Sequence, residues 1–361
     1  MNSANYNDII NTTTNVGTNG GPSHYGTYDQ GGNAYEWTST AAPTVSGQDY
    51  VVARGGRFVG RNASVGLMAD YNHEFPPSQY GIGIGFRIAS QGYGFAETSG
   101  VFDKNVYSDP LGLEEFCWVT DTGNWDDQQQ AVYVNEVLEE PMYSGIVGRV
   151  DHDYLIGQYQ VYVEQYCEFL NAVASTSDTY GIYKSLMSNA GPHGIIDTAT
   201  VSGVTTYSPR DYCYHRPITS VRWYDALRYC NWLDNGKPSG TQSSSTTEDG
   251  AYPVSGLTTT DDSSIVMNST NPNTGLSPSY WLPTNDEWHK AAYYQGHGTQ
   301  SLYWTYPTQS DIPPLMTSPG EYNNGQYAMH KGGKTTTLNL LDSNSNPITL
   351  TFYNGLLIHA E

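Results

Sequence analysis

The sequence is poor in charged residues, above all in basic ones, and it has no long apolar run. Of its 361 residues only 15 are Lys or Arg, against 36 Asp or Glu, which gives a formal net charge of −21 at pH 7. Binding to nucleic acid needs clustered basic side chains that meet the phosphates, so this excess of acid argues against a nucleic-acid partner. No apolar run approaches the roughly 18 residues of a membrane-spanning helix, so we expect no membrane insertion.

Cysteine is also scarce. The four copies, Cys117, Cys167, Cys213 and Cys230, have no CxxC spacing, which argues against a zinc site. Two interpretations stay open at this point. The cysteines form one or two disulfides, or they are four buried free thiols.

Tyrosine, by contrast, is abundant, with 31 copies, and Gly, Ser, Thr and Asn are frequent. The length suits about two domains. A surplus of Tyr, Thr and Asn over Lys and Glu is typical of extracellular or cell-surface proteins. No secretory leader is recognisable before Asn2, so we expect that a leader has been removed or that export follows another route.

Three amphipathic helices are predicted in the second part of the chain. Apolar residues recur at spacings of three and four in residues 158–174 and again in residues 220–234. The third helix begins at Thr284, where Thr284 and Glu287 have the spacing of a capping box. Asp225 and Glu287 lie on these helices, and we expect structural salt bridges to Arg222 or Arg54.

The remaining segments are short strands and loops. Residues 1–24 predict irregular coil, whereas residues 51–53 and 83–88 predict short strands. The polar loop at residues 236–279 is long for a compact domain, and such loops are usually either functional or loosely held. Residues 335–341 and 347–353 flank a turn and predict a β-hairpin in the C-terminal tail.

Two groups of motifs carry a family resemblance. The first group is Tyr25–Thr38, Ala53–Phe58 and Gly85–Ala89. The second group is Tyr154–Val161, Pro217–Ala226 and Trp281–Trp288. Together they resemble the formylglycine-generating-enzyme (sulfatase-modifying-factor) family, but the family's closing motifs here precede its opening motifs.

The resemblance implies a loop-rich α+β fold that is related to C-type lectins, is circularly permuted and carries a C-terminal β-hairpin. Residues 1–90 would then be the C-terminal half of a family domain, and residues 116–320 its N-terminal half. Residues 91–115 would be the linker between them, and residues 321–361 the hairpin tail.

The resemblance also bears on catalysis. In the family's enzymes a cysteine pair soon after the RGG motif binds copper, and the matching positions lie near Gly60 and Val65. Neither residue is cysteine, and no cysteine precedes Cys117. Because soft Cu(I) needs thiolate ligands, the resemblance favours a non-catalytic member, with no catalytic residues.

A second metal is implied by the resemblance: calcium in a structural role. The matching positions, Asp29, Gly32, Ala34 and Glu36, offer the carboxylate and carbonyl oxygens that this cation prefers. The alternative is that Glu36 caps a turn while Trp37 fills the core.

The motif order poses a packing problem, because a half-domain leaves apolar surface and backbone groups exposed. The chain folds back on itself, or it completes the half-domain of the next molecule in an open filament, or it is an excerpt of a longer tandem array. The tail hairpin either adds to a neighbour's sheet edge or closes the domain internally.

From this we expect a non-catalytic, secreted or cell-surface structural protein that self-assembles with copies of itself, for example into an extracellular filament. One alternative is a lectin-like module that binds a ligand or glycan. The other is a metal-dependent oxidase of the formylglycine-generating type.

Overall fold

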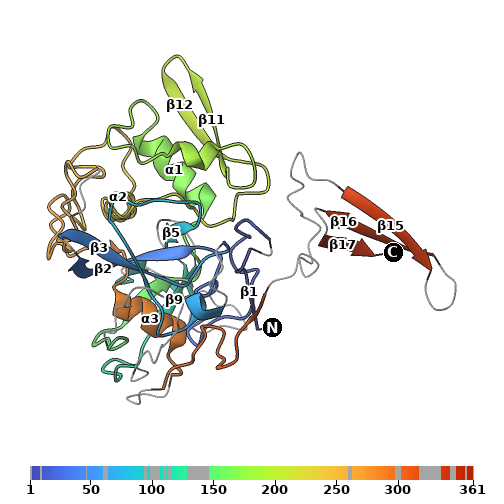
Figure 1. Cartoon of the computed structure of the whole chain (residues 1–361). Coiled ribbons are helices and arrows are strands. Elements are labelled where there is room, and N and C mark those ends of the chain that lie inside the picture. Colours follow the sequence, from blue (N-terminus) through green and yellow to red (C-terminus); the bar gives the residue numbers. More distant parts are fainter. Residues whose placement is uncertain are drawn as a thin grey trace.

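The computed structural model mixes a few helices with small sheets and long loops, as an α+β fold does (Figure 1). It describes residues 2–8, 10–45, 47–59, 64–92, 96–97, 106–108, 111, 115–127, 146–258, 262–296, 302–316, 335–341, 347–353 and 356–360. Below, residues 2–92 are called the N-terminal block and residues 115–316 the C-terminal block.

The three predicted helices are confirmed. They are α1 (Val163–Val173), α2 (Trp223–Asp234) and α3 (Asn285–Tyr293). At the start of α3 the Glu287 backbone N–H donates to the Thr284 hydroxyl at 3.1 Å, and the Thr284 N–H donates to the Glu287 carboxylate at 2.8 Å. This is the capping box that the sequence predicts. None of the described helices is long and apolar enough to cross a bilayer.

The largest sheet interleaves strands from the two blocks. Its order is β13 (Tyr280–Trp281), β6 (Ala89–Ser90), β10 (Tyr154–Gly157), β9 (Glu115–Val119), β8 (Val106–Ser108) and β7 (Ala96–Glu97), all antiparallel. Strand β6 of the N-terminal block therefore lies between two strands of the C-terminal block. The segment expected to be a linker, residues 91–115, supplies β7 and β8 to this sheet.

A four-stranded sheet belongs to the N-terminal block. Its order is β4 (His73–Phe75), β3 (Gln48–Arg54), β2 (Tyr35–Val45) and β5 (Ile84–Phe86), and only the β2–β5 pair is parallel. Strands β3 and β5 confirm the two strands that the sequence predicts. Side chains of both blocks fill one hydrophobic core, in which Trp37, Trp223 and Trp288 are fully buried. The chain thus folds back on itself.

The first described residues are not only coil. Strand β1 (Ser3–Ala4) pairs in parallel with β14 (Leu315–Met316), near the end of the C-terminal block. The expectation of irregular coil over residues 1–24 is wrong at this point. A two-residue strand has no sequence pattern of its own, because a distant segment decides its pairing.

Two further groups of strands complete the fold. Strands β11 (Ile196–Val201) and β12 (Val204–Pro209) form a hairpin that we did not predict. The predicted tail hairpin is confirmed as β15 (Thr335–Leu341) and β16 (Pro347–Tyr353). A third strand, β17 (Leu356–Ala360), extends it to a sheet that is separate from all the others (Figure 1). The two short 3₁₀ helices are η1 (Ser64–Leu67) and η2 (Ser185–Ser188).

All four cysteines are buried and free, so the free-thiol interpretation is confirmed and the disulfide interpretation is wrong. Burial raises the pKa of the Cys167 thiol to about 12 and that of Cys230 well above its ordinary value. These thiols act as small apolar side chains of the core.

Candidate functional site

A pocket of about 640 Å³ opens where the two blocks meet. The lining comes from the N-terminal block and from three segments of the C-terminal block. The residues are Ser39 and Gln91 of the N-terminal block, His152 and Asp153 before β10, Tyr252 and Ile265, Val266 and Met267 of the polar loop, and Trp281, Thr284 and Glu287 at the start of α3. The pocket is therefore complete only when the blocks are docked.

Hydrogen bonds at both of its carboxylate oxygens hold the Glu287 side chain in place in the pocket. One carboxylate oxygen, Oε2, accepts from the backbone N–H of Thr284 at 2.8 Å and from the indole N–H of Trp281 at 3.2 Å. The other oxygen, Oε1, lies 2.9 Å from Nε2 of His152. The Glu287 side chain is almost fully buried, whereas the His152 side chain is 57% exposed. Glu287 thus holds the histidine at the pocket surface.

The hydrogen bond to Glu287 raises the pKa of His152, and partial burial acts in the opposite direction. The imidazole therefore holds its proton to a higher pH than an ordinary histidine. Such a pair can move a proton or present a positive charge to a ligand.

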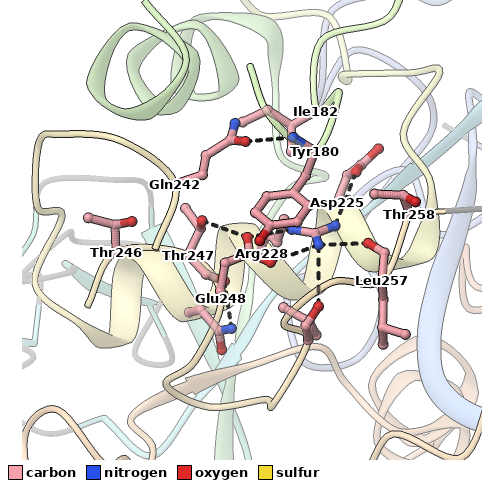
Figure 2. A network of polar contacts seen from close by, with 12 residues as sticks. Tyr180, Ile182, Asp225, Arg228, Gln242, Thr246, Thr247, Glu248, Leu257 and Thr258 are labelled. Carbon is pink, nitrogen blue, oxygen red and sulfur yellow. Dashed lines mark hydrogen bonds and ion pairs between the residues drawn. The ribbon is translucent and has the colours of Figure 1, made fainter. Parts of the chain in front are cut away.

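A buried polar network fixes the polar loop that forms one wall of the pocket (Figure 2). The Arg228 guanidinium on α2 donates to both carboxylate oxygens of Glu248, at 2.7 and 2.9 Å, and to the Leu257 carbonyl at 2.7 Å. Its other face covers the Tyr180 ring, with the guanidinium carbon 4.5 Å from the ring centroid. These contacts anchor the described part of the loop between Thr247 and Leu257.

Asn231, also on α2, forms hydrogen bonds with the polar loop next to the pocket. Its amide N–H groups donate to the carbonyls of Thr247 and Tyr252, each at 2.8 Å, and its oxygen accepts from the Tyr252 N–H at 2.7 Å. The backbone of a lining residue is thereby fixed by α2.

One of the expected ion pairs is present and one is not. Asp225 pairs with Arg222 at 2.8 Å and with Lys184 at 2.7 Å, as a fully buried carboxylate. Arg54 does not reach Glu287, and it donates instead to the Asn285 side chain at 2.6 Å and to the Ala69 carbonyl at 2.7 Å. The expectation of an Arg54–Glu287 pair is wrong, because the capping box and His152 occupy the Glu287 carboxylate.

The four predicted calcium ligands are close in sequence and buried, and protein groups already bond three of them, Asp29, Ala34 and Glu36. Glu36 receives two N–H groups of the Arg87 guanidinium, at 2.7 and 2.9 Å, and the Trp288 indole at 2.6 Å. Asp29 accepts from the Gly17 N–H at 2.5 Å, and burial raises the pKa of its carboxyl to about 6.

One of the two predicted carbonyl ligands is already engaged, because the Ala34 carbonyl accepts from the Gln160 amide at 2.9 Å. A calcium ion at Glu36 would compete with the Arg87 guanidinium for the same carboxylate, so the arrangement seen here favours the ion pair over the cation. The described residues contain no group of three or more His, Cys, Asp or Glu that could hold a metal. Calcium stays a prediction.

Of the two positions that match the family's copper cysteines, Gly60 lies outside the described residues. Val65 lies in η1 and is half-buried.

The family model of the sulfatase-modifying factor enzyme 1-like domain matches residues 2–91 and 139–347. The chain belongs to this family. The match confirms the resemblance and covers both motif groups. No curated protein and no solved structure matches the chain. In this sulfatase-modifying factor enzyme 1-like chain, both matched segments contribute to the core, and they supply strands β6, β10 and β13 of the six-stranded sheet.

Sequence reasoning missed His152 and the apolar wall of the pocket. Asp151, His152 and Asp153 form no motif, and Glu287 is far away in the sequence, so no local signal marks the pair. The apolar wall did carry a signal, because Ile265, Val266 and Met267 are three consecutive apolar residues inside a long polar loop.

Proposed function

We propose that this sulfatase-modifying factor enzyme 1-like protein is a non-catalytic module that binds a small ligand in the pocket between the two blocks. The observation that carries the proposal is the chemical contrast inside the pocket. His152 and Asp153 are accessible polar groups, while Val266 and Met267 are 74% and 42% exposed in the same lining.

The shape and the composition of the pocket support this proposal. Ligand sites are typically about 300–1,000 Å³, largely apolar, and carry a few polar groups that orient the ligand. Exposed Val and Met side chains in a concave surface gain from being covered, at about 25 cal/mol per Å² of apolar area. A ligand with both polar and apolar parts satisfies the whole lining.

The thiols support a non-catalytic role. A reactive cysteine needs access and a lowered pKa, since the thiolate is the nucleophile and the metal ligand. Here Cys167, Cys213 and Cys230 are buried, and burial raises the pKa of each.

A thermal-shift screen of a small-molecule library tests the binding function. The variant Gln91→Trp places a bulky side chain at an exposed lining position, and Leu276→Trp makes the same change at an exposed position of the polar loop outside the lining. Ligands present at 100 times their Kd should stabilise the native protein and Leu276→Trp by about 2.7 kcal/mol. They should leave Gln91→Trp unshifted. If no compound distinguishes the two variants, the pocket is not a binding site.

A second function, self-assembly, is favoured by the C-terminal sheet. Within the described residues its outer strands, β15 and β17, pair on one side only. An open strand edge is a template for strand addition between molecules. In the described chain each block is completed by the other, so we propose assembly through this sheet rather than through exchanged half-domains. The composition, rich in Tyr and with few charged residues, supports a secreted or cell-surface location.

The assembly is tested by size-exclusion chromatography and electron microscopy of the full chain with Leu338→Pro and, separately, Asn339→Pro. In an edge strand, alternate residues direct their backbone N–H away from the neighbouring strand. Leu338 and Asn339 are adjacent, so one of the two N–H groups points to the open edge of β15. Proline at that position removes an edge donor without breaking the β15–β16 pairing. We expect both variants to lose assembly. A wild-type protein that stays monomeric at high concentration would contradict this function.

A further inference from the structure

We infer that the pocket selects an organic cation, a ligand that carries an ammonium or guanidinium group next to an apolar segment. This inference rests on the proposed binding function and names its ligand class. It follows from the charges, the free hydrogen-bonding capacity and the exposed apolar surface of the lining.

The charges of the lining are of one sign. Asp153 and Glu287 are its carboxylates, and none of the described residues that line it is Lys or Arg. His152 is the single lining residue that can become positive. A carboxylate or phosphate ligand would therefore meet repulsion in the pocket, whereas a cation would meet attraction.

Asp153 is the group that is available to the ligand. Both oxygens of Glu287 are engaged, by Thr284 and Trp281 on one side and by His152 on the other. Asp153 is exposed, and within the described chain no residue forms a hydrogen bond or an ion pair with its side chain. A charge-assisted hydrogen bond to an ammonium group is the strongest contact that this carboxylate can make.

The apolar wall of the pocket favours a ligand with an apolar segment. Ile265, Val266 and Met267 present hydrocarbon and thioether surface, and a methionine side chain adapts its shape to what it covers. Trp281 and Tyr252 are 5% and 2% exposed, so they close the floor rather than offer a stacking face.

Several charges near the pocket modulate this preference. His152 faces Glu287 and Lys290 on α3 and has Asp151 and Asp153 beside it in the chain. The Lys290 ammonium donates to the Asp121 carbonyl at 3.0 Å, and burial lowers its pKa to about 8. Both His152 and Lys290 lose positive charge as the pH rises from 6 to 9. The affinity for a cation should rise over the same interval.

The test compares three probes with one aryl-alkyl body: phenethylamine, 2-phenylethanol and 3-phenylpropionate. Calorimetry on the full chain at pH 7.5 should give phenethylamine a Kd at least about fivefold below that of the other two, as expected for about 1 kcal/mol of charge interaction. Asp153→Asn should abolish this preference. Asp151→Asn is the matched control, because Asp151 is an exposed carboxylate outside the lining that pairs with Arg149, and it should retain the preference.

The outcomes separate this inference from the proposed function. Equal binding of the three probes, or stronger binding of a neutral saccharide, overturns the cation inference. If Gln91→Trp blocks that binding, the pocket remains a ligand site. A preference for phenethylamine that Asp153→Asn leaves intact also overturns the inference. If Gln91→Trp affects no probe, the proposed function fails as well. A melting curve of Asp153→Asn that matches the wild type shows that the variant is folded.

Discussion

Trp37 and Trp223 each donate a hydrogen bond across the boundary between the two blocks, to a backbone carbonyl close in sequence to the other tryptophan. The Trp37 indole N–H donates to the Val221 carbonyl, and the Trp223 indole N–H donates to the Thr38 carbonyl, each at 2.9 Å. Both side chains are fully buried. Each tryptophan thus satisfies a backbone group next to the other, and the docking of the blocks depends on both.

The first prediction concerns these hydrogen bonds. Trp37→Phe keeps most of the buried ring but leaves the Val221 carbonyl without its donor, which should cost about 1–3 kcal/mol of unfolding free energy. Chemical denaturation of the purified protein measures the loss. Trp125→Phe is the control, because Trp125 is 62% exposed, and we expect a change within about 0.5 kcal/mol. Equal effects of the two substitutions would contradict the prediction.

The second prediction concerns the ion pair of Glu36 and Arg87, in which both side chains have no exposed surface. Glu36→Gln leaves the guanidinium charge buried and unpaired, so we expect a loss of about 3–5 kcal/mol. The exposed pair of Arg149 and Asp151 offers the comparison, and Asp151→Asn should change stability by less than about 1 kcal/mol. Denaturant titrations of both variants measure the difference.

The third prediction concerns calcium. Arg87 and Trp288 donate three hydrogen bonds to the Glu36 carboxylate, and the guanidinium neutralises its charge, so a cation would have to compete with Arg87 there. We expect the melting temperature to be the same with excess chelator and with added calcium. A fall on chelation that calcium reverses, and magnesium does not, would establish the calcium site that the sequence predicts.

The fourth prediction concerns the titration of His152. Its pKa is raised in the folded state by the hydrogen bond to Glu287, so protonation favours the folded protein. This stabilisation is complete below the ordinary histidine pKa of about 6.5 and is lost as the pH rises through the higher folded-state value. Glu287→Gln keeps a residue that suits a capping box, and it should lower the His152 pKa toward its ordinary value.

An NMR titration of the His152 ring protons measures this pKa. Glu164→Gln removes an exposed carboxylate from the first turn of α1 and should leave it unchanged. The assignment of the pair would be wrong if both substitutions shifted the His152 pKa equally.

The sequence predicts those parts of the fold that depend on neighbouring residues. The capping box is recognised from the spacing of Thr284 and Glu287 alone. The tail hairpin is recognised from two strand-like segments that flank a turn. The hairpin of β11 and β12 also had a local signal that we missed. Ser202 and Gly203 both have positive φ, of 52° and 81°, and a Ser-Gly pair suits such a turn.

The remaining features depend on residues that are far apart in the sequence. Strand β6 has two residues, which is too few for any period, and it is a strand because β10 and β13 flank it. The pair of His152 and Glu287 arises in the same way, since the docking of α3 near the start of β10 brings the two side chains together. The sequence could suggest a role for the polar loop, but only the contacts of Arg228 and Asn231 place it at a pocket.

The position of β6 between β10 and β13 also fixes an order of events during synthesis. The N-terminal block leaves the ribosome before either flanking strand exists. At about 5–20 residues per second, translation from β6 to β13 takes on the order of ten to forty seconds. The edge of β6 that pairs with β13 lacks its partner through that interval, whereas β10 is made about 65 residues after β6 and Val221, the partner of Trp37, about 130 residues after it. This surface is therefore accessible to other molecules before the rest of the protein can cover it.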